Sequence, residues 1–272
     1  MTYTLRDLNA AVEQLWPTRY SEEWDRPGLT VGDSLDKVTR IHLAVDAVGE
    51  TVDEALELGA DALLVHHPLL LRGITSLSTE RYKGALLTKL VRGKCALIAA
   101  HTNADIVPAG TSGVLARLLG LVDATPIVAG ERPGTGIGRV GDLAEPTTLG
   151  RLALSLAEIL PATATGIRVS GEYDRPVTRV AVCGGAGDSL LAEPAVLAAD
   201  VYITSDLRHH PASEAREQAI VSDGPALIDV SHWASEWLWL DQAASELRAA
   251  LPGVEVTVSE LRSDPWDFVV TQ

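Results

Sequence analysis

The chain contains a partial repeat of itself, and this repeat limits its fold more than any other feature. The tripeptide Thr-Arg-Ile at 39–41 returns as Thr-Arg-Val at 178–180, and the dipeptide Ala-Asp at 60–61 returns at 199–200. The two copies are separated by the same 139 residues in both cases. A spacing that stays constant over separate segments is typical of an internal duplication. We therefore expect two related halves.

Each copy of the repeat predicts a strand, a helix and a second strand. Short apolar runs indicate the strands, and an apolar period of three to four residues indicates the helix. This order is the signature of a parallel sheet with a right-handed crossover, so the sequence predicts an α/β fold. The expected segments are Ile41–Val45, Thr51–Leu58 and Ala62–Val65 in the first copy, and Val180–Val182, Ser189–Ala198 and Val201–Thr204 in the second.

A second pair of segments extends the duplication. An Ala-Leu-Ile run occurs before His101 and Asp105, and the same run occurs before His232 and Glu236. In both copies the carboxylate follows the histidine by four residues. Residues four apart lie on one face of a helix, with about 5–6 Å between their Cβ atoms. Each pair can therefore hold one metal ion.

A Gly- and Pro-rich loop at 130–141 lies between the two copies. After this loop we expect a helix to begin at Thr147 or Thr148, because threonine is a favourable N-cap residue ahead of an apolar helical pattern. The expected halves are 1–125 with 228–272 for the first, and 126–227 for the second.

The charge of the chain limits its partners. The sequence has 22 Lys and Arg against 37 Asp and Glu, a formal charge of −15. This balance argues against nucleic acid or an anionic membrane, because affinity for phosphate surfaces depends on clustered cations. No apolar run approaches the roughly 20 residues that span a bilayer. The start of the chain predicts an amphipathic helix rather than a signal peptide. We therefore expect a cytoplasmic protein.

Histidines and carboxylates gather where strands are expected to end. His66 and His67 close one strand, and Asp206 with His210 follows the equivalent strand of the second copy. Open α/β sheets build their sites at the carboxyl ends of strands. Imidazole with carboxylate and without thiolate favours zinc, iron, manganese, nickel or cobalt. Together with the two His-x-x-x-carboxylate pairs, these residues are numerous enough for a dinuclear centre.

Other patterns carry less information. The glycines at 136–141 fit a dinucleotide-binding pattern but lack the strand before and the helix after. The Gly-rich segment 183–189 follows a strand, and is either a tight turn or an anion site at a helix N-terminus. Cys95 and Cys183 lie in apolar runs without zinc-site spacing, which predicts buried free thiols. The tryptophans at 233–239 are expected in the core, where one or two can also line a base-binding cleft.

Five further segments of the sequence form a recognisable set: Trp24–Leu29 with Val31 and Gly32, Val65–Pro68, Ala100–Asp105, Thr204–Asp206 with His210, and Asp229–Glu236. With these motifs the sequence resembles the NIF3-like family, also known as GTP cyclohydrolase 1 type 2 homologues. The resemblance runs nearly end to end and includes five motifs in the family's order. Two small departures are Ser205 where relatives often have Gly, and Arg26 in place of an Asn. Some relatives carry a large inserted domain that this chain lacks.

This resemblance implies two intertwined α/β halves with a dinuclear metal site between them, and often a toroidal homohexamer. It places His101 beside the centre, as a second-shell or substrate-facing group. The two divalent ions would be zinc, iron, manganese, nickel or cobalt. The ligands that it implies are His66, His67, Asp105, His232 and Glu236.

Three functions remain open at this point. The first is a metal-dependent hydrolase of a nucleotide or similar small molecule, with His101, Asp206 or His210 orienting water or protonating the leaving group. The second is a metal-stabilised scaffold or regulatory interaction protein without catalysis. The third, least favoured by the acidic charge, is a ring that binds nucleic acid through its central opening.

Overall fold

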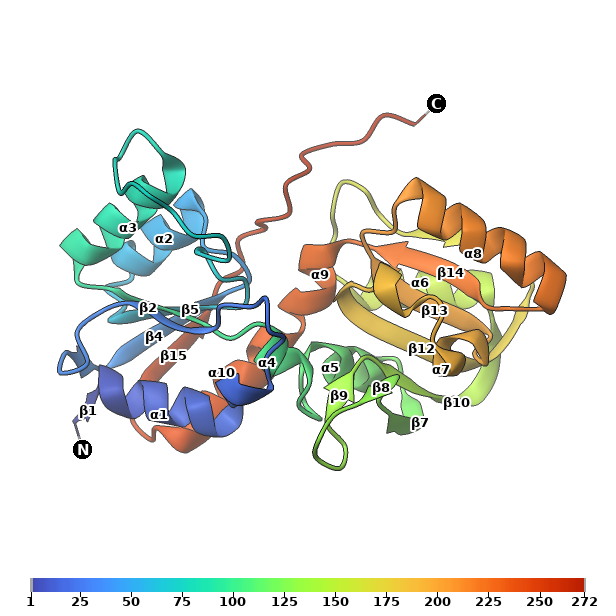
Figure 1. The fold of residues 1–272 in the computed structure, drawn as a ribbon, viewed down its shortest axis with the longest axis horizontal. Coiled ribbons are helices and arrows are strands. Elements are labelled where there is room, and N and C mark those ends of the chain that lie inside the picture. The colour runs from blue at the N-terminus through green and yellow to red at the C-terminus, as the bar shows by residue number, and fades with distance from the viewer. Residues whose placement is uncertain (1, 272) are drawn as a thin grey trace. The chain divides into compact units, whose positions relative to one another are not determined.

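The computed structural model describes residues 2–271, which form two compact units (Figure 1). Unit 1 comprises the chain up to Ala104 together with Leu240–Ser263. Unit 2 comprises Asp105–Trp239 together with the segment from Asp264 onward. Each unit is therefore made of two separate stretches of sequence. Within the described residues, no helix has the length and apolar character needed to cross a membrane.

Unit 1 is built on a five-stranded sheet. Its strands are β2 (Gly28–Val31), β4 (Arg40–Ala44), β5 (Ala62–Val65), β6 (Ala96–Ala99) and β15 (Glu255–Val258), and its helices are α1 (Leu5–Leu15), α2 (Gly49–Glu57), α3 (Tyr82–Gly93) and α10 (Trp239–Ala250). The strand order is β15-β4-β5-β6-β2, parallel except for β2. Helices α2 and α3 cover one face of the sheet, and α1 and α10 cover the other (Figure 1).

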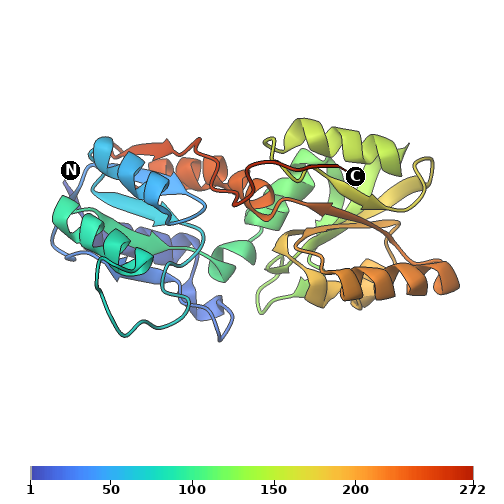
Figure 2. The same cartoon turned by 90° about the horizontal axis from the view of Figure 1, so that it is seen from above.

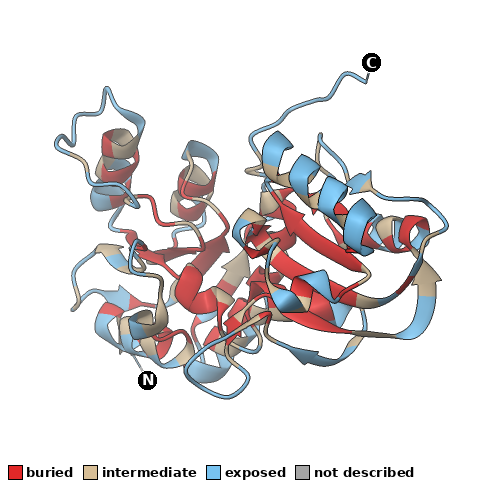
Figure 3. Ribbon diagram, turned by 45° about the vertical axis from the view of Figure 1, so that its right-hand side comes forward, coloured by how far each residue is buried: buried red, intermediate tan, exposed pale blue. Residues whose placement is uncertain are grey.

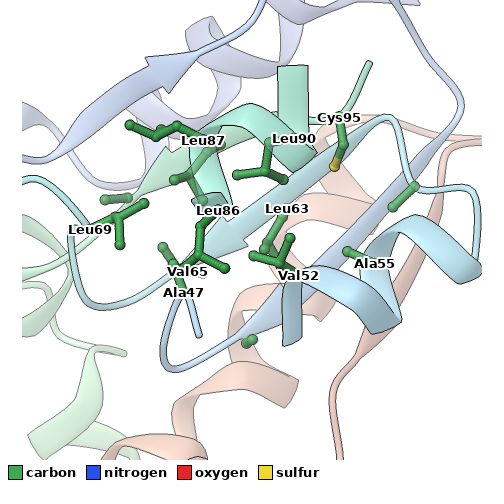
Figure 4. Close-up of a cluster of buried hydrophobic side chains, with 14 residues drawn as sticks. Ala47, Val52, Ala55, Leu63, Val65, Leu69, Leu86, Leu87, Leu90 and Cys95 are labelled. Carbon is green, nitrogen blue, oxygen red and sulfur yellow. The ribbon is translucent and has the colours of Figure 1, made fainter. Parts of the chain in front are cut away.

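One core cluster of unit 1 lies between this sheet and helices α2 and α3. Leu63 and Val65 of β5 pack in one cluster with Val52 of α2 and with Leu87 and Leu90 of α3 (Figure 4). All residues of β5 and β6 are buried, as expected of central parallel strands that are covered on both faces. This packing fixes the carboxyl ends of both strands, where the candidate histidines follow.

Unit 2 is built on a six-stranded sheet. Its strands are β7 (Leu121–Thr125), β10 (Arg139–Thr148), β11 (Arg168–Ser170), β12 (Pro176–Ala186), β13 (Val201–Ser205) and β14 (Ala226–Val230), and its longer helices are α5 (Thr111–Leu118), α6 (Leu149–Ile159), α8 (His209–Ser222) and α9 (His232–Trp237). The order is β11-β14-β13-β12-β10-β7, and β12, β13 and β14 are parallel. Helices α6 and α8 lie on opposite faces (Figure 2). No residue of α8 is buried (Figure 3).

Short elements complete the two units. Strands β1 and β3 pair with each other in unit 1, and β8 and β9 pair in unit 2. The bounds are β1 (Tyr3–Thr4), β3 (Lys37–Val38), β8 (Val128–Ala129), β9 (Gly136–Ile137), α4 (Thr102–Asp105), α7 (Pro194–Leu197) and the 3₁₀ turns Thr18–Tyr20 and Asp188–Leu190.

The structure confirms the internal duplication and shows what the repeated Asp does in each copy. In unit 1 the carboxylate of Asp61 accepts hydrogen bonds from the backbone N–H groups of Thr39 and Arg40, at 2.6 and 2.9 Å. In unit 2 the carboxylate of Asp200 accepts hydrogen bonds from the backbone N–H groups of Thr178 and Arg179, at 2.8 Å each. These three residues lie 139 positions after Asp61, Thr39 and Arg40. The repeated Asp therefore ties the start of one strand to the start of the next in both units.

Two of the sequence predictions need correction. The helix expected over Ser189–Ala198 is a 3₁₀ turn followed by the short helix α7, because Pro194 cannot occupy a helix interior. The division into halves also differs from 1–125 with 228–272 and 126–227. Strand β7 pairs with β10, and β14 pairs with β13, so residues 105–125 and 228–239 belong to unit 2.

The other elements agree with the sequence predictions. Helix α1 buries Leu5, Leu8 and Val12 on one face. Helix α6 begins after Thr148, whose hydroxyl accepts a hydrogen bond from the backbone N–H of Arg151 at 3.4 Å. An N-cap of this kind satisfies one of the backbone donors at the start of a helix.

Candidate metal centre

Three histidines of unit 1 meet at the carboxyl ends of β5 and β6. His66 and His67 follow β5, and their ring centroids are 5.1 Å apart. His101 follows β6, with its ring 5.2 Å from that of His66 and 5.4 Å from that of His67. One nitrogen from each ring lies within 4.8 Å of the other two. Neighbouring parallel strands thus bring together residues that are 34 or more positions apart in sequence.

In each of these histidines, Nδ1 lies within hydrogen-bonding distance of an oxygen atom. The carbonyl oxygen of Ala100 lies 2.8 Å from Nδ1 of His66. The carboxylate of Asp46 lies 2.7 Å from Nδ1 of His67. The carboxylate of Asp25 lies 2.8 Å from Nδ1 of His101. Such contacts place the proton on Nδ1 and make Nε2 the nitrogen that each ring can offer to an ion.

Asp25 is held firmly in place. Its carboxylate accepts hydrogen bonds from the backbone N–H of Thr102 at 3.0 Å, from the Thr102 hydroxyl at 2.5 Å and from the backbone N–H of Arg26 at 2.7 Å. Burial alone would raise the pKa of Asp25, but the hydrogen bonds from His101 and Thr102 outweigh it and lower the pKa from 3.8 to about 2. Asp25 is therefore ionised and orients His101.

The donor set of unit 1 fits a divalent metal ion of the predicted kind. Three imidazoles whose Nε2 atoms are the ones open to an ion are a common ligand set for zinc, and they also suit iron, nickel and cobalt. Oxygen atoms on the far ring nitrogens are the usual second contact of metal-binding histidines. His42 has both ring nitrogens occupied within the fold, by Thr257 at 2.8 Å and Glu54 at 2.9 Å. His42 thus has a structural role, as expected.

Unit 2 presents a different cluster at the end of β14. His232 begins α9, and its Nδ1 lies 2.7 Å from the carboxylate of Asp206. Its Nε2 lies 3.0 Å from the carboxylate of Glu236, one helical turn later. Burial lowers the pKa of His232, but the carboxylates of Glu236 and Asp206 outweigh it and raise the pKa to about 11. The predicted histidine–carboxylate pair is therefore in contact on one helical face.

The backbone around this second cluster has unusual conformations and approaches the side chains closely. Asp206 follows β13 with a φ of 57°, a left-handed conformation that is uncommon for a residue with a side chain. Gly185 has a φ of 72°, and a Cβ there would overlap the Glu236 carboxylate and lie 3.3 Å from Nε2 of His232. The N–H of Gly185 donates to the hydroxyl of Ser235 at 2.9 Å. Glycine is required here for the backbone to approach the cluster.

Two further predicted residues make other contacts. Asp105 ends α4, and its carboxylate accepts a hydrogen bond from the Thr111 hydroxyl at 2.5 Å within unit 2. His210 lies exposed in the first turn of α8, with its ring 5.2 Å from that of His209. The structure thus groups His66 with His67 and His101, and His232 with Asp206 and Glu236.

Three residues of the site were missed by the sequence analysis. Asp25 and Asp46 orient histidines, and Trp24 lies beside His101 with ring centroids 5.7 Å apart. The motif around Trp24 and Asp25 was noted, but nothing in its spacing pointed to a histidine 76 positions later. Asp46 had a weak signal, because it follows a predicted strand end as His67 does.

The two cysteines are confirmed as buried free thiols. Cys183 lies within β12, so the segment after it continues the strand as far as Ala186. The 3₁₀ turn that follows is too short to provide a helical anion site.

Comparison with known proteins places this α/β fold and its histidine motifs in a family. A sequence model of Duf34/NIF3 (NGG1p interacting factor 3) matches residues 3–265. The chain therefore belongs to the Duf34/NIF3 family, as the resemblance in the sequence had indicated.

Three relatives illustrate this membership. A "GTP cyclohydrolase 1 type 2 homolog" of Streptomyces coelicolor is 43% identical over 269 residues, covering 96% of this chain and 93% of the relative. A protein of the same name from Mycobacterium tuberculosis is 34% identical over an alignment of 379 residues, covering 98% of each. The crystal structure of Staphylococcus aureus SA1388 has a TM-score of 0.88 and 25% identity, covering 99% of this chain and 100% of that one.

Proposed function

We propose that this chain binds two divalent metal ions and acts as a metal-dependent hydrolase on a nucleotide or related small molecule. The proposed ligands come from both units. The observation that carries the proposal is that four histidines each have a hydrogen-bonding oxygen atom at Nδ1, which makes Nε2 the nitrogen that can bind an ion. The ions are zinc, iron, manganese, nickel or cobalt. The ligands are His66, His67, Asp105, His232 and Glu236.

The structure supports separate roles for these residues and for their supporting shell. Bound divalent ions would supply Lewis acidity at the bond that reacts. Asp46 and Asp206 hold the rings of His67 and His232 in the ligand orientation. Asp206 therefore acts through His232 as a positioning residue rather than on the substrate, which replaces the catalytic role expected from the sequence.

His101 is the residue that we propose for proton transfer. Asp25 fixes its Nδ1, so Nε2 can take or give a proton next to the other two imidazoles. Trp24, beside it, has 55% of its surface exposed although the turn around it is tied to Thr102. An exposed indole in a rigid turn can stack on a planar ring. This arrangement supports a nucleobase or another aromatic group in the substrate.

Elemental analysis of protein purified without chelator tests the metal centre. We expect about two ions per chain in the parent and a loss of metal in His66→Ala and in His232→Ala. His42→Gln is the matched control, because His42 is buried but has both nitrogens engaged in the fold. A parent protein with no bound metal after incubation with each candidate ion would overturn the proposal. A parent with only one ion would overturn its dinuclear part.

Turnover of nucleotides by the metal-loaded protein tests the chemistry. In His101→Ala we expect the metal content to stay and hydrolysis to fall at least 100-fold, as general acid–base groups commonly contribute. If His101→Ala loses metal instead, His101 is a ligand and not the proton-transfer group.

A metal-stabilised scaffold or regulatory interaction protein is the second candidate. The family description names an interacting factor, which is the observation in its favour. If the parent shows no turnover and removal of metal dissociates an oligomer, the scaffold is correct and the hydrolase is not. The homohexamer and the cytoplasmic location stay predictions, and nucleic acid remains an unfavoured partner.

A further inference from the structure

The end of the chain exposes an unusual concentration of apolar side chains. Residues 265–271 have no helix or strand and run outward to the C-terminus (Figure 1). Trp266 is 61% exposed, Phe268 79%, Val269 59% and Val270 74%. Phe268 is the only phenylalanine of the chain. Single exposed apolar residues are ordinary, but a contiguous group of large ones indicates an interaction site.

The base of this segment is anchored to unit 2. The carboxylate of Asp264 accepts hydrogen bonds from the hydroxyl of Ser231 at 2.5 Å and from the backbone N–H of Trp266 at 3.1 Å. Ser231 is also the N-cap of α9. The apolar segment therefore starts from a fixed point on the surface of unit 2.

An apolar pocket opens at the same point. Its volume is about 480 Å³, and Ser231 and Ala234 form one side of it. The opposite walls come from α6, from the chain that follows α6 and from β11, and none of the lining residues is charged. Leu154, Val169 and Tyr173 in these walls are 58%, 42% and 58% exposed. The pocket has the size and lining of a site for apolar side chains.

We infer that the C-terminal segment 265–271 of one chain occupies this pocket on a second copy of the same chain. Ser231 both anchors the segment and lines the pocket, so the two surfaces adjoin. Two copies that approach through this edge can exchange both segments at once, in a contact that uses the same residues on each side. Pro265 favours an extended conformation of Asp264 before it.

The area that this exchange buries is sufficient for a stable contact. Two aromatic and two valine side chains that are now mostly exposed would bury roughly 400 Å² per segment, and the pocket walls a similar area. Reciprocal exchange doubles this to roughly 1,600 Å², the usual size of a specific protein–protein interface. A segment in its own pocket would bury the same area per chain, roughly 800 Å², but would not join two copies.

The net charge of the chain predicts how the association of two copies depends on salt concentration. Two copies that each carry a formal charge of −15 repel each other, while the pocket itself is uncharged. Added salt screens the repulsion without weakening apolar burial. We therefore expect the association of two copies to become stronger between low and moderate salt.

Disulfide trapping between two different variants tests which pocket the segment occupies. One chain carries Phe268→Cys and the other, of different mass, carries Ala157→Cys on the pocket wall; the native thiols are buried. We expect a crosslinked heterodimer after mixing and mild oxidation. If the mixture does not crosslink but a chain with both substitutions closes an internal disulfide, the segment occupies its own pocket and the inference is wrong. Absence of both crosslinks also overturns it.

A second measurement keeps the test independent of the crosslink. Leu154→Glu places a charge in the pocket wall, and we expect it to weaken self-association at least tenfold in sedimentation velocity. Leu197→Glu is the matched control, because Leu197 is 47% exposed on α7 of the same unit but does not line the pocket. Truncation after Asp264 should weaken association as Leu154→Glu does. Unchanged association in both variants would overturn the exchange.

Discussion

In unit 1 His67 follows strand β5, whereas in unit 2 the equivalent position, 139 residues later, is Asp206 after strand β13. Both units then place a histidine after the next strand, His101 in unit 1 and His232 in unit 2. In unit 1 the result is a cluster of three imidazoles, and in unit 2 it is one imidazole between two carboxylates. The same backbone thus offers nitrogen donors in one copy and mainly oxygen donors in the other. The two copies therefore share a backbone frame but differ in the side chains at these positions.

The largest expected effect comes from a backbone substitution that disturbs the cluster of unit 2 and leaves that of unit 1 unchanged. Gly185→Ala adds a Cβ that overlaps Glu236, in addition to the strain at a φ of 72°. We expect a loss of roughly 2–4 kcal/mol in unfolding free energy. Gly166→Ala is the control, since Gly166 has a φ of 60° but open space around its Cβ. It should lose only about 1 kcal/mol from backbone strain.

Denaturant unfolding of the metal-free proteins measures both values. Metal binding by the folded Gly185→Ala protein should also weaken, whereas Gly166→Ala should bind as the parent does. Equal losses in the two variants would show that Glu236 moves away freely and that the cluster of unit 2 is not held rigidly.

The orienting carboxylates allow the two clusters to be compared directly. Asp25→Asn and Asp206→Asn each remove a charge from the Nδ1 side of one histidine, His101 or His232. Loss of an outer partner typically weakens metal binding roughly 10–100-fold. We expect a loss of this size for Asp206→Asn. Asp25→Asn should instead lower turnover at unchanged metal affinity, because we assign His101 to proton transfer. Calorimetric titration with one divalent ion, together with turnover, separates the two outcomes.

Much of this architecture can be predicted from the sequence because it depends on local patterns. The repeat, the central strands and the N-cap at Thr148 can each be recognised from a few residues that are close together in the sequence. The proposed metal ligands on α9 are also local, since His232 and Glu236 are one turn apart. Asp25 could not be predicted in the same way, because its contact with His101 depends on a turn packed against α4 and not on any sequence spacing.

The division into units shows the same limit. Strands β7 and β14 lie on the wrong side of the predicted boundaries, because a strand joins the sheet that offers it hydrogen-bond partners. Those partners, β10 and β13, are chosen by tertiary packing. Asp105 is a further example, since no sequence spacing indicated its contact with the Thr111 hydroxyl.

The repeated Asp residues at the strand starts provide a test of equal effects in the two units. Asp61→Ala and Asp200→Ala each leave two backbone N–H groups without their carboxylate acceptor. We expect each variant to lose about 1–2 kcal/mol of unfolding free energy. Asp61→Ala should lose slightly more, because Asp61 also accepts from the Thr39 hydroxyl at 2.8 Å. Thermal and denaturant unfolding would check this, and a loss confined to one unit's variant would argue against equivalent roles.

The smallest expected effect concerns the single thiol of each unit. Burial raises the pKa of Cys95 to about 11, and burial together with the nearby Asp105 carboxylate raises that of Cys183 to about 12. At pH 8 the thiolate fractions are therefore about one in a thousand and one in ten thousand. We expect negligible reaction with a thiol reagent in the native protein and two reacting thiols after unfolding. Because both folded pKa values lie above the value of 9.0 for a free thiol, these groups favour the folded state below pH 9, and the contribution is lost as the pH rises through 11 to 12. Rapid labelling of one thiol at pH 8 would show that its unit opens locally, and comparison of the two labelling rates would show which unit opens first.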